Sequence, residues 1–106
     1  MCNPYLSSQS FRLSNISKIP IEAKGVYGIW DKKYCIYIGR TWDQGLRMRL
    51  MQHWSDCHNR KLKKWIEVKK QRLDFNFKEF FSEEETKEME KFYYNLYKPI
   101  ANIQRL

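Results

Sequence analysis

The chain has 106 residues, of which 20 are Lys or Arg and 12 are Asp or Glu, so its formal net charge is +8. This length suits one domain with a single core and leaves little room for a second module. Mean hydropathy is −0.76, and no apolar run approaches the roughly 20 residues that cross a bilayer. No apolar segment typical of a signal peptide follows the first residues. We therefore expect a cytoplasmic protein.

The positive charge is concentrated in the middle of the chain. A stretch of about a dozen residues contains Arg60, Lys61, Lys63, Lys64, Lys69, Lys70 and Arg72. Such a patch suits the phosphate backbone of a nucleic acid. A solvated helix face, or another acidic partner, would give the same pattern.

Residues 1–22 are rich in Ser and Asn. Ile16, Ile19 and Ile21 are the possible anchors in this segment, around Pro20. We expect an N-terminal arm that packs loosely on a domain formed by residues 23–106.

A β-hairpin follows the arm. Residues 26–30 and 34–38 are β-branched and aromatic, and they flank Asp31-Lys32-Lys33, which indicates a three-residue loop. A symmetric loop would pair Tyr27 with Tyr37. Alternation then divides the hairpin into two faces: one carries Gly25, Tyr27, Ile29, Cys35, Tyr37 and Gly39, and the other carries Val26, Trp30, Tyr34, Ile36 and Ile38. We expect the second face to be buried under helices and the tyrosine face to open into a cleft, where the glycines let a ligand approach.

The rest of the chain alternates helices with one strand. Apolar spacing predicts helices over residues 46–54 and 60–71, with Leu62, Trp65 and Ile66 buried in the second. Alternation predicts a strand over residues 73–81. These elements give an α/β sandwich with a small, three-stranded antiparallel sheet flanked by helices.

A last helix begins at Ser82. Ser82 and Glu85 form a capping box, and Pro99 ends the helix. Its predicted apolar stripe is Met89, Phe92, Tyr93 and Leu96.

The cysteines do not form a recognisable framework. Cys2, Cys35 and Cys57 are an odd set without a CxxC pair, so we expect no disulfide. His53, Cys57 and His58 are close enough in sequence to raise a zinc site, but a fourth ligand and the usual paired spacing are missing.

Several motifs follow one another in a fixed order. Gly25-Val26-Tyr27 and Tyr37-Ile38-Gly39 resemble the signature of the GIY-YIG nuclease family. The family's arginine and the histidine one turn later match Arg49 and His53. Its glutamate and its asparagine after a proline match Glu90 and Asn102. The resemblance covers roughly residues 25–102.

Two positions depart from the family pattern. The segment after Tyr37 is longer than usual, so Arg47 lies where a shorter spacing would place the catalytic arginine. We prefer Arg49, because it shares a helix face with His53. Several carboxylates compete for the metal position, and we select Glu90 by its spacing to Asn102 and its place at the edge of the apolar stripe. The others look solvated or are used by the cap: Glu83, Glu84, Glu85 and Glu88.

The resemblance implies a metal-dependent endonuclease that hydrolyses DNA phosphodiester bonds with one Mg²⁺, for which Mn²⁺ can substitute. It implies Tyr27 as general base, and a phenol with a reference pKa near 10 can do this only if positive charge lowers that pKa. The other implied roles are Tyr37 to position phosphate or water, Arg49 to stabilise the transition state, His53 to assist and Glu90 to bind the metal. Arg40 and Asn102 would be substrate-binding positions, with Asn102 also holding the site together. Trp42 joins them on other grounds, because it lies in a loop beside the site and its ring can stack on an exposed base.

Other functions stay open. A catalytically silent nucleic-acid-binding module could keep the same fold and basic face, and a small protein-interaction domain could use lysines only for solubility. Taken alone, paired tyrosines in a hairpin are usually cross-strand packing. The sequence also leaves open DNA versus RNA, the biological role, and whether a homodimer or a partner protein supplies specificity.

Overall fold

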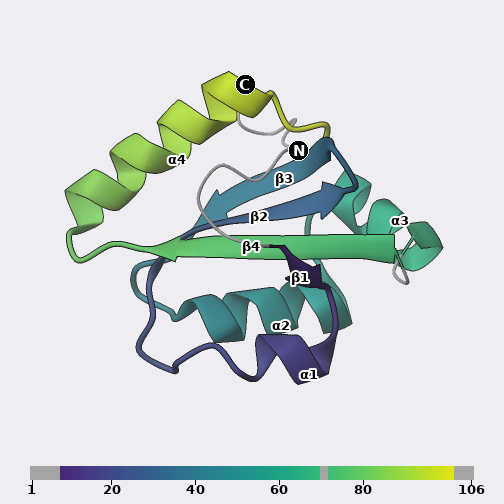
Figure 1. Ribbon diagram of the computed structural model, residues 1–106, viewed down its shortest axis with the longest axis horizontal. Coiled ribbons are helices and arrows are strands. Elements are labelled where there is room, and N and C mark those ends of the chain that lie inside the picture. The colour runs from purple at the N-terminus through teal and green to yellow at the C-terminus, as the bar shows by residue number, and fades with distance from the viewer. Residues whose placement is uncertain (1–7, 70–71, 102–106) are drawn as a thin grey trace.

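A computed structural model describes residues 8–69 and 72–101 of the chain (Figure 1). Its elements in order are β1 (Gln9–Ser10), α1 (Leu13–Ile16), β2 (Gly25–Asp31), β3 (Tyr34–Arg40), α2 (Leu46–Asp56), α3 (Arg60–Lys69), β4 (Leu73–Glu79) and α4 (Glu83–Tyr97). The strands form one antiparallel sheet in the order β1-β4-β2-β3. Helices α1 and α2 lie on one side of this sheet and α4 on the other (Figure 1). The α/β sandwich is confirmed, but the sheet has four strands rather than three.

The fourth strand comes from the N-terminal segment. Gln9 pairs with Phe75 on β4, and Phe11, Ile16 and Ile19 are buried in the main core. The expectation of loose packing is therefore wrong for residues 8–22, which contribute backbone and side chains to the fold. The division into an arm and a domain at residues 22 and 23 stays a prediction.

The hairpin has a different register from the one expected. Its loop contains only Lys32 and Lys33, and Lys32 adopts a left-handed backbone with φ of 56°. Tyr27 lies opposite Gly39, and Ile29 lies opposite Tyr37. The register then shifts by one residue, so Ile36 is the extra residue of a β-bulge. The predicted pairing of Tyr27 with Tyr37 is wrong because alternation reveals neither the shorter loop nor the bulge.

Because of the bulge, Cys35 and Ile36 lie on the opposite faces of the sheet from those expected by alternation. Ile36 joins Tyr27 and Ile29 in the larger core, whereas Cys35 joins Val26 and others in a second core. Both positions were predicted on the opposite faces. Tyr27 and Tyr37 nevertheless share one face, with ring centroids 6.1 Å apart.

Both faces of the hairpin are covered. The larger core fills the side of α1 and α2, and the second core, built around Val26, Trp30 and Ile38, contains Tyr93 from α4. Tyr27 is fully buried, while Tyr37 is half-buried. The expectation of an open tyrosine face is thus wrong for Tyr27.

The helices begin and end largely as predicted. The Oγ of Ser82 accepts a hydrogen bond from the Glu85 backbone N–H at 3.2 Å, which confirms the N-cap of α4. Helix α4 ends at Tyr97, before Pro99. Helix α3 starts after Asn59, whose Oδ1 accepts from the Leu62 N–H at 2.9 Å. Trp65 is only partly buried, unlike its neighbours on the predicted stripe.

The buried side of α4 is rotated from the predicted stripe. Its buried residues are Thr86, Glu90 and Tyr93, whereas Phe92 and Leu96 are 54% and 55% exposed. The buried residues are polar or aromatic, and the spacing of apolar residues alone does not predict the burial of Thr86 and Glu90. The strand before α4 also ends earlier than predicted, at Glu79.

The chain that follows α4 returns to the outer edge of β3. The backbone N–H of Ile100 donates to the carbonyl of Cys35 at 3.2 Å, and that of Ala101 donates to the carbonyl of Ile36 at 2.8 Å. These two bonds attach the C-terminal segment to the sheet beside the bulge. In the described ranges, 8–69 and 72–101, no helix has the length and apolar character needed to cross a membrane.

Candidate active site

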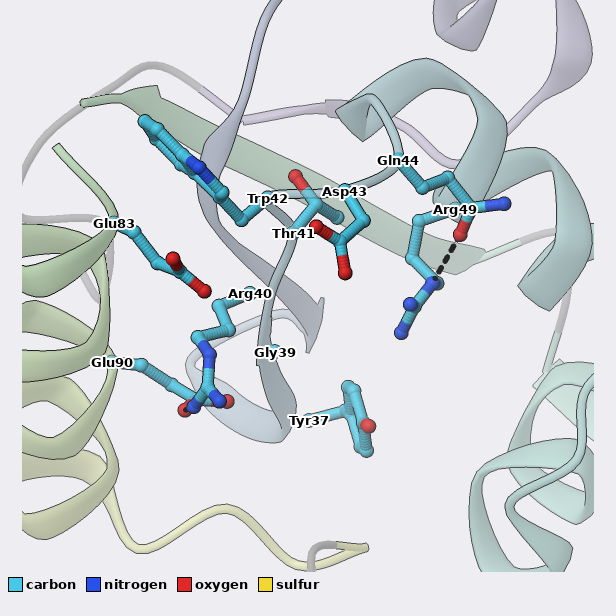
Figure 2. Close-up of a pocket in the computed structure, with 10 residues that line it drawn as sticks. All are labelled: Tyr37, Gly39, Arg40, Thr41, Trp42, Asp43, Gln44, Arg49, Glu83 and Glu90. Atoms are coloured by element: carbon cyan, nitrogen blue, oxygen red, sulfur yellow. Dashed lines mark hydrogen bonds and ion pairs between the residues drawn. The ribbon is translucent and has the colours of Figure 1, made fainter. Parts of the chain in front are cut away.

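A cleft of about 310 Å³ opens at the end of β3. Strand β3, the loop after it, α2 and α4 all supply side chains to its walls (Figure 2). The lining residues are Tyr37, Gly39, Arg40, Thr41, Trp42, Asp43, Gln44, Arg49, Glu83 and Glu90. Most of these side chains are polar or charged, so the cleft suits a charged ligand better than an apolar one.

Glu90 and Arg40 form one wall of the cleft. Arg40 Nη1 lies 2.7 Å from Glu90 Oε1. The Glu90 side chain is only 3% exposed, whereas that of Arg40 is 37% exposed. A buried carboxylate requires a partner of opposite charge, and Arg40 supplies it from a strand 50 positions away in sequence.

Arg49 lies on the opposite wall of the cleft. Its Nε donates to Gln44 Oε1 at 2.9 Å (Figure 2), and the positive charge of its guanidinium acts to lower the pKa of Tyr27, against the larger opposite effect of burial. Arg47 instead donates to the carbonyl of Ile19 at 2.9 Å, on the N-terminal segment. Of the two candidate arginines, Arg49 is therefore the one at the cleft.

Tyr27 lies behind the cleft, packed on the backbone of β3. A Cβ placed on Gly39 would come 2.4 Å from Tyr27 Oη and 2.5 Å from its Cζ. The predicted role of this glycine was to admit a ligand. The structure shows instead that Gly39 makes room for the ring of Tyr27.

Tyr27 is the first of three buried side chains, followed by His53 and Cys57, that form a line of hydrogen bonds. Its Oη lies 2.7 Å from His53 Nε2. The other ring nitrogen, Nδ1, lies 3.2 Å from Cys57 Sγ. From sequence, His53 was grouped with Cys57 and His58 because they are close along the chain, but only as a possible zinc site. In the described part of the chain, no three His, Cys, Asp or Glu side chains are arranged to hold a metal ion.

Burial is the largest cause of the shifted pKa values of Tyr27, Tyr37 and His53. It raises the pKa of Tyr27 well above 10, and Tyr37 raises it further, whereas Arg49 acts in the opposite direction. Burial also raises the pKa of Tyr37, with a contribution from Glu90. The pKa of His53 falls to about 4, through burial first and then Arg49. At neutral pH, the two phenols and the imidazole are therefore all uncharged.

The sequence model of the GIY-YIG catalytic domain family matches residues 23–104 of the chain. The chain belongs to the GIY-YIG family. No curated protein sequence matches it.

Solved structures of another GIY-YIG domain share the fold. The magnesium-bound GIY-YIG N-terminal endonuclease domain of UvrC from Thermotoga maritima has a TM-score of 0.66 and 23% identity, over 86% of this chain and 96% of that one. A point mutant of the same domain, bound to its catalytic divalent cation, has a TM-score of 0.67 and 24% identity, over 85% and 92%.

The two GIY-YIG tripeptides meet at one pair of residues on neighbouring strands. Tyr27 of the first is opposite Gly39 of the second, because β2 and β3 are antiparallel. Of the predicted site residues, the structure brings Tyr37, Arg40, Trp42, Arg49 and Glu90 to the cleft. Tyr27 and His53 form the buried layer behind it, and Asn102 lies outside the described residues.

Some contributions were missed from sequence. Gln44, which holds Arg49, gave no signal beyond its place in a polar turn. Glu83 was predicted to be solvated, and its side chain is indeed 52% exposed, but it also lines the cleft from the first turn of α4, which was not predicted. Lys24 also lies near the cleft, with its Nζ 5.3 Å from the ring centroid of Trp42.

Proposed function

We propose that this GIY-YIG protein is a divalent-metal-dependent endonuclease that hydrolyses phosphodiester bonds in DNA. The observation that carries the proposal is the convergence of Glu90, Arg40, Arg49 and Tyr37 on one cleft. A carboxylate for a metal, cations for a phosphate and a hydroxyl for a water are the groups that this hydrolysis needs. A silent nucleic-acid-binding module would have no use for a buried carboxylate at the wall of a cleft that also holds two arginines.

Glu90 fits the role of metal ligand. Mg²⁺ typically takes one or two protein carboxylates and keeps several waters, so the single buried carboxylate of Glu90 suits one ion of Mg²⁺ or Mn²⁺. Its Oε1 is held by Arg40, and the Arg40 side chain, which is partly exposed and already lines the cleft, can release Glu90 and turn to a bound phosphate. When bound, Mg²⁺ supplies Lewis-acid stabilisation of the charge that develops on the phosphate oxygens.

The remaining roles follow from which groups face the cleft. Tyr37 lies at the cleft, so we assign to it, rather than to Tyr27, the contact with the attacking water. The condition set for Tyr27 as general base was a lowered pKa, and burial has the opposite effect. Arg49 stabilises the transition-state charge, and Tyr27 and His53 support Tyr37 from behind. Arg40, once released from Glu90, contacts phosphate.

DNA also fits the positive charge on the surface of α3. The exposed side of α3 carries Arg60, Lys61, Lys63 and Lys64, with Glu67 as the acidic residue beside them. Basic side chains on one helix face can neutralise successive phosphates, which makes binding salt-dependent. Trp42, in the loop at the cleft, offers a ring to an unstacked base.

The test is a cleavage panel of duplex, flap, branched and single-stranded DNA with Mg²⁺. We expect Glu90→Gln to lower the cleavage rate by about a hundredfold or more. Glu88→Gln is the matched control, because it makes the same charge change at an exposed position of the same helix. Circular dichroism checks that both variants are folded. Cleavage unchanged in Glu90→Gln would remove Glu90 as the ligand, and salt-dependent binding without cleavage in the wild type would favour the silent module.

A further inference from the structure

Cys57 ends a line of buried polar groups that begins at Tyr27. The exposed fractions of Tyr27, His53 and Cys57 are 0%, 8% and 6%. The thiol of Cys57 donates in turn to the backbone carbonyl of Asn59, with Sγ and O 3.6 Å apart. Buried polar groups must find their hydrogen-bond partners within the protein, so the hydrogens along this line can be counted.

The direction of the bond from Cys57 to Asn59 favours one form of the imidazole. The sulfur of Cys57 has one hydrogen, which points to a carbonyl that can only accept. The hydrogen between Cys57 and His53 therefore belongs to Nδ1. A neutral imidazole has a single N–H, so Nε2 has none and accepts from the hydroxyl of Tyr27, 2.7 Å away.

We propose that Cys57 is a positioning residue that holds His53 in its Nδ1–H tautomer, so that His53 accepts the hydroxyl hydrogen of Tyr27. The tautomer is set by the acceptor that the other ring nitrogen finds. Here that acceptor is a thiol sulfur one helical turn further along the chain.

The end of the line is fixed to the fold. The carbonyl of Asn59 also accepts the N–H of Lys63 at 2.8 Å, in the first turn of α3. Asn59 Nδ2 donates to the carbonyl of Ala101 at 2.8 Å, and its Oδ1 accepts from Leu62. With Asn59 held at three points, the direction of the Cys57 thiol is determined by the backbone.

The consequence at the cleft rests on the proposed nuclease function. Tyr27 gives its only hydrogen to His53, so its oxygen presents only lone pairs to its other neighbours, Arg49 and Tyr37, which also act on it electrostatically. The hydroxyl of Tyr37, whose ring lies on the same face, would then point its hydrogen inward and turn lone pairs toward the cleft. A water there would donate a hydrogen to Tyr37 and direct its own lone pair at the phosphate.

The tautomer is measured by long-range ¹H–¹⁵N correlation spectra of the ¹⁵N-labelled full chain at pH 7. His58→Gln assigns the signals, because the chain has two histidines. We expect the wild-type His53 to be protonated at Nδ1. Cys57→Ser keeps a group that accepts from Nδ1 and donates to Asn59, and should keep this form. Cys57→Ala leaves no acceptor at Nδ1, and should move the hydrogen to Nε2, where Tyr27 can accept it.

The control is Cys35→Ala, since Cys35 is buried on the other side of the sheet, and it should leave the tautomer unchanged. An Nε2–H form in the wild type, or an Nδ1–H form that persists in a folded Cys57→Ala, would overturn the proposal.

Cleavage assays separate this proposal from the nuclease function. We expect Cys57→Ala to lose about ten- to a hundredfold in rate, as when the orienting partner of a functional histidine is removed, and Cys57→Ser to restore most of it. A tautomer change in a protein that does not cut DNA would support the role of Cys57 and refute the nuclease. Cleavage at the wild-type rate despite a changed tautomer would refute the consequence for Tyr37.

Discussion

His53 should make the stability of this protein fall steeply in mild acid. Burial and Arg49 lower its pKa from 6.5 to about 4. Between these two values, the unfolded chain binds a proton that the folded protein does not, so the free energy of unfolding rises with pH and is lost on acidification. At 1.36 kcal/mol per pH unit, the interval from 6.5 to about 4 corresponds to about 3 kcal/mol.

The assay is urea unfolding at several pH values between 4 and 7, for the wild type and for His53→Phe. The variant loses the bonds to Tyr27 and Cys57, which lowers its stability at every pH by a similar amount. It also loses the titrating group. We therefore expect the difference between the two curves to shrink by about 3 kcal/mol as the pH falls from 7 to 4.

Other acidic groups also have shifted pKa values, but they are present in both the wild type and His53→Phe. Burial raises the pKa of Asp74, and the hydrogen bond from Arg72 lowers that of Asp31. Their contributions cancel in the difference. His58→Gln tests the smallest of the three causes of the shift, because His58 also lowers the pKa of His53, after burial and Arg49; its curve should stay much closer to that of the wild type than the curve of His53→Phe does. Parallel curves for the wild type and His53→Phe would refute the reasoning.

Two further changes probe the cleft. Arg40→Gln should tighten Mg²⁺ or Mn²⁺ binding about fivefold in calorimetric titration, because it frees Glu90 of its ion pair; the arginine is partly exposed, so the pair is worth only roughly 1 kcal/mol. Arg47→Gln makes the same charge change away from Glu90 and should leave the metal affinity unchanged. Equal metal affinities in the two variants would contradict this prediction. Gly39→Ala should lower the free energy of unfolding by about 2 kcal/mol, since its Cβ would overlap the buried ring of Tyr27; a urea midpoint equal to that of the wild type would show that the ring can move aside.

The parts of the fold that depend on local patterns were predictable. Capping by Ser82, the stop before Pro99 and the apolar spacing of α2 and α3 each lie within a few residues of sequence. The pairing of Gln9 with Phe75 does not. A two-residue strand carries no periodicity of its own, so nothing local distinguishes β1 from a loose arm.

The register of the hairpin failed for a different reason. Alternation assumes one residue on each strand per pair, and the bulge at Ile36 breaks that assumption. A left-handed Lys32 also shortens the loop, although lysine gives no signal for that conformation.

The sequence predicted which residues make up the candidate site, but not which of them face the cleft and which lie buried behind it. The spacing of Arg49 and His53 indicates a shared helix flank, yet Arg49 reaches the cleft while His53 points to the buried Tyr27. The ion pair of Arg40 with Glu90 joins segments 50 positions apart. Only the packing of α4 beside β3 brings them together.

The C-terminal segment attached to β3 has a consequence for self-association. An outer strand with unpaired backbone groups invites another chain to extend the sheet, which is a route to aggregation. At one end of β3, Ile100 and Ala101 already occupy the carbonyls of Cys35 and Ile36. The bulge at Ile36 twists the edge beside this attached segment, and at the other end the strand finishes in the charged Arg40. These features make β3 a poor template for sheet extension.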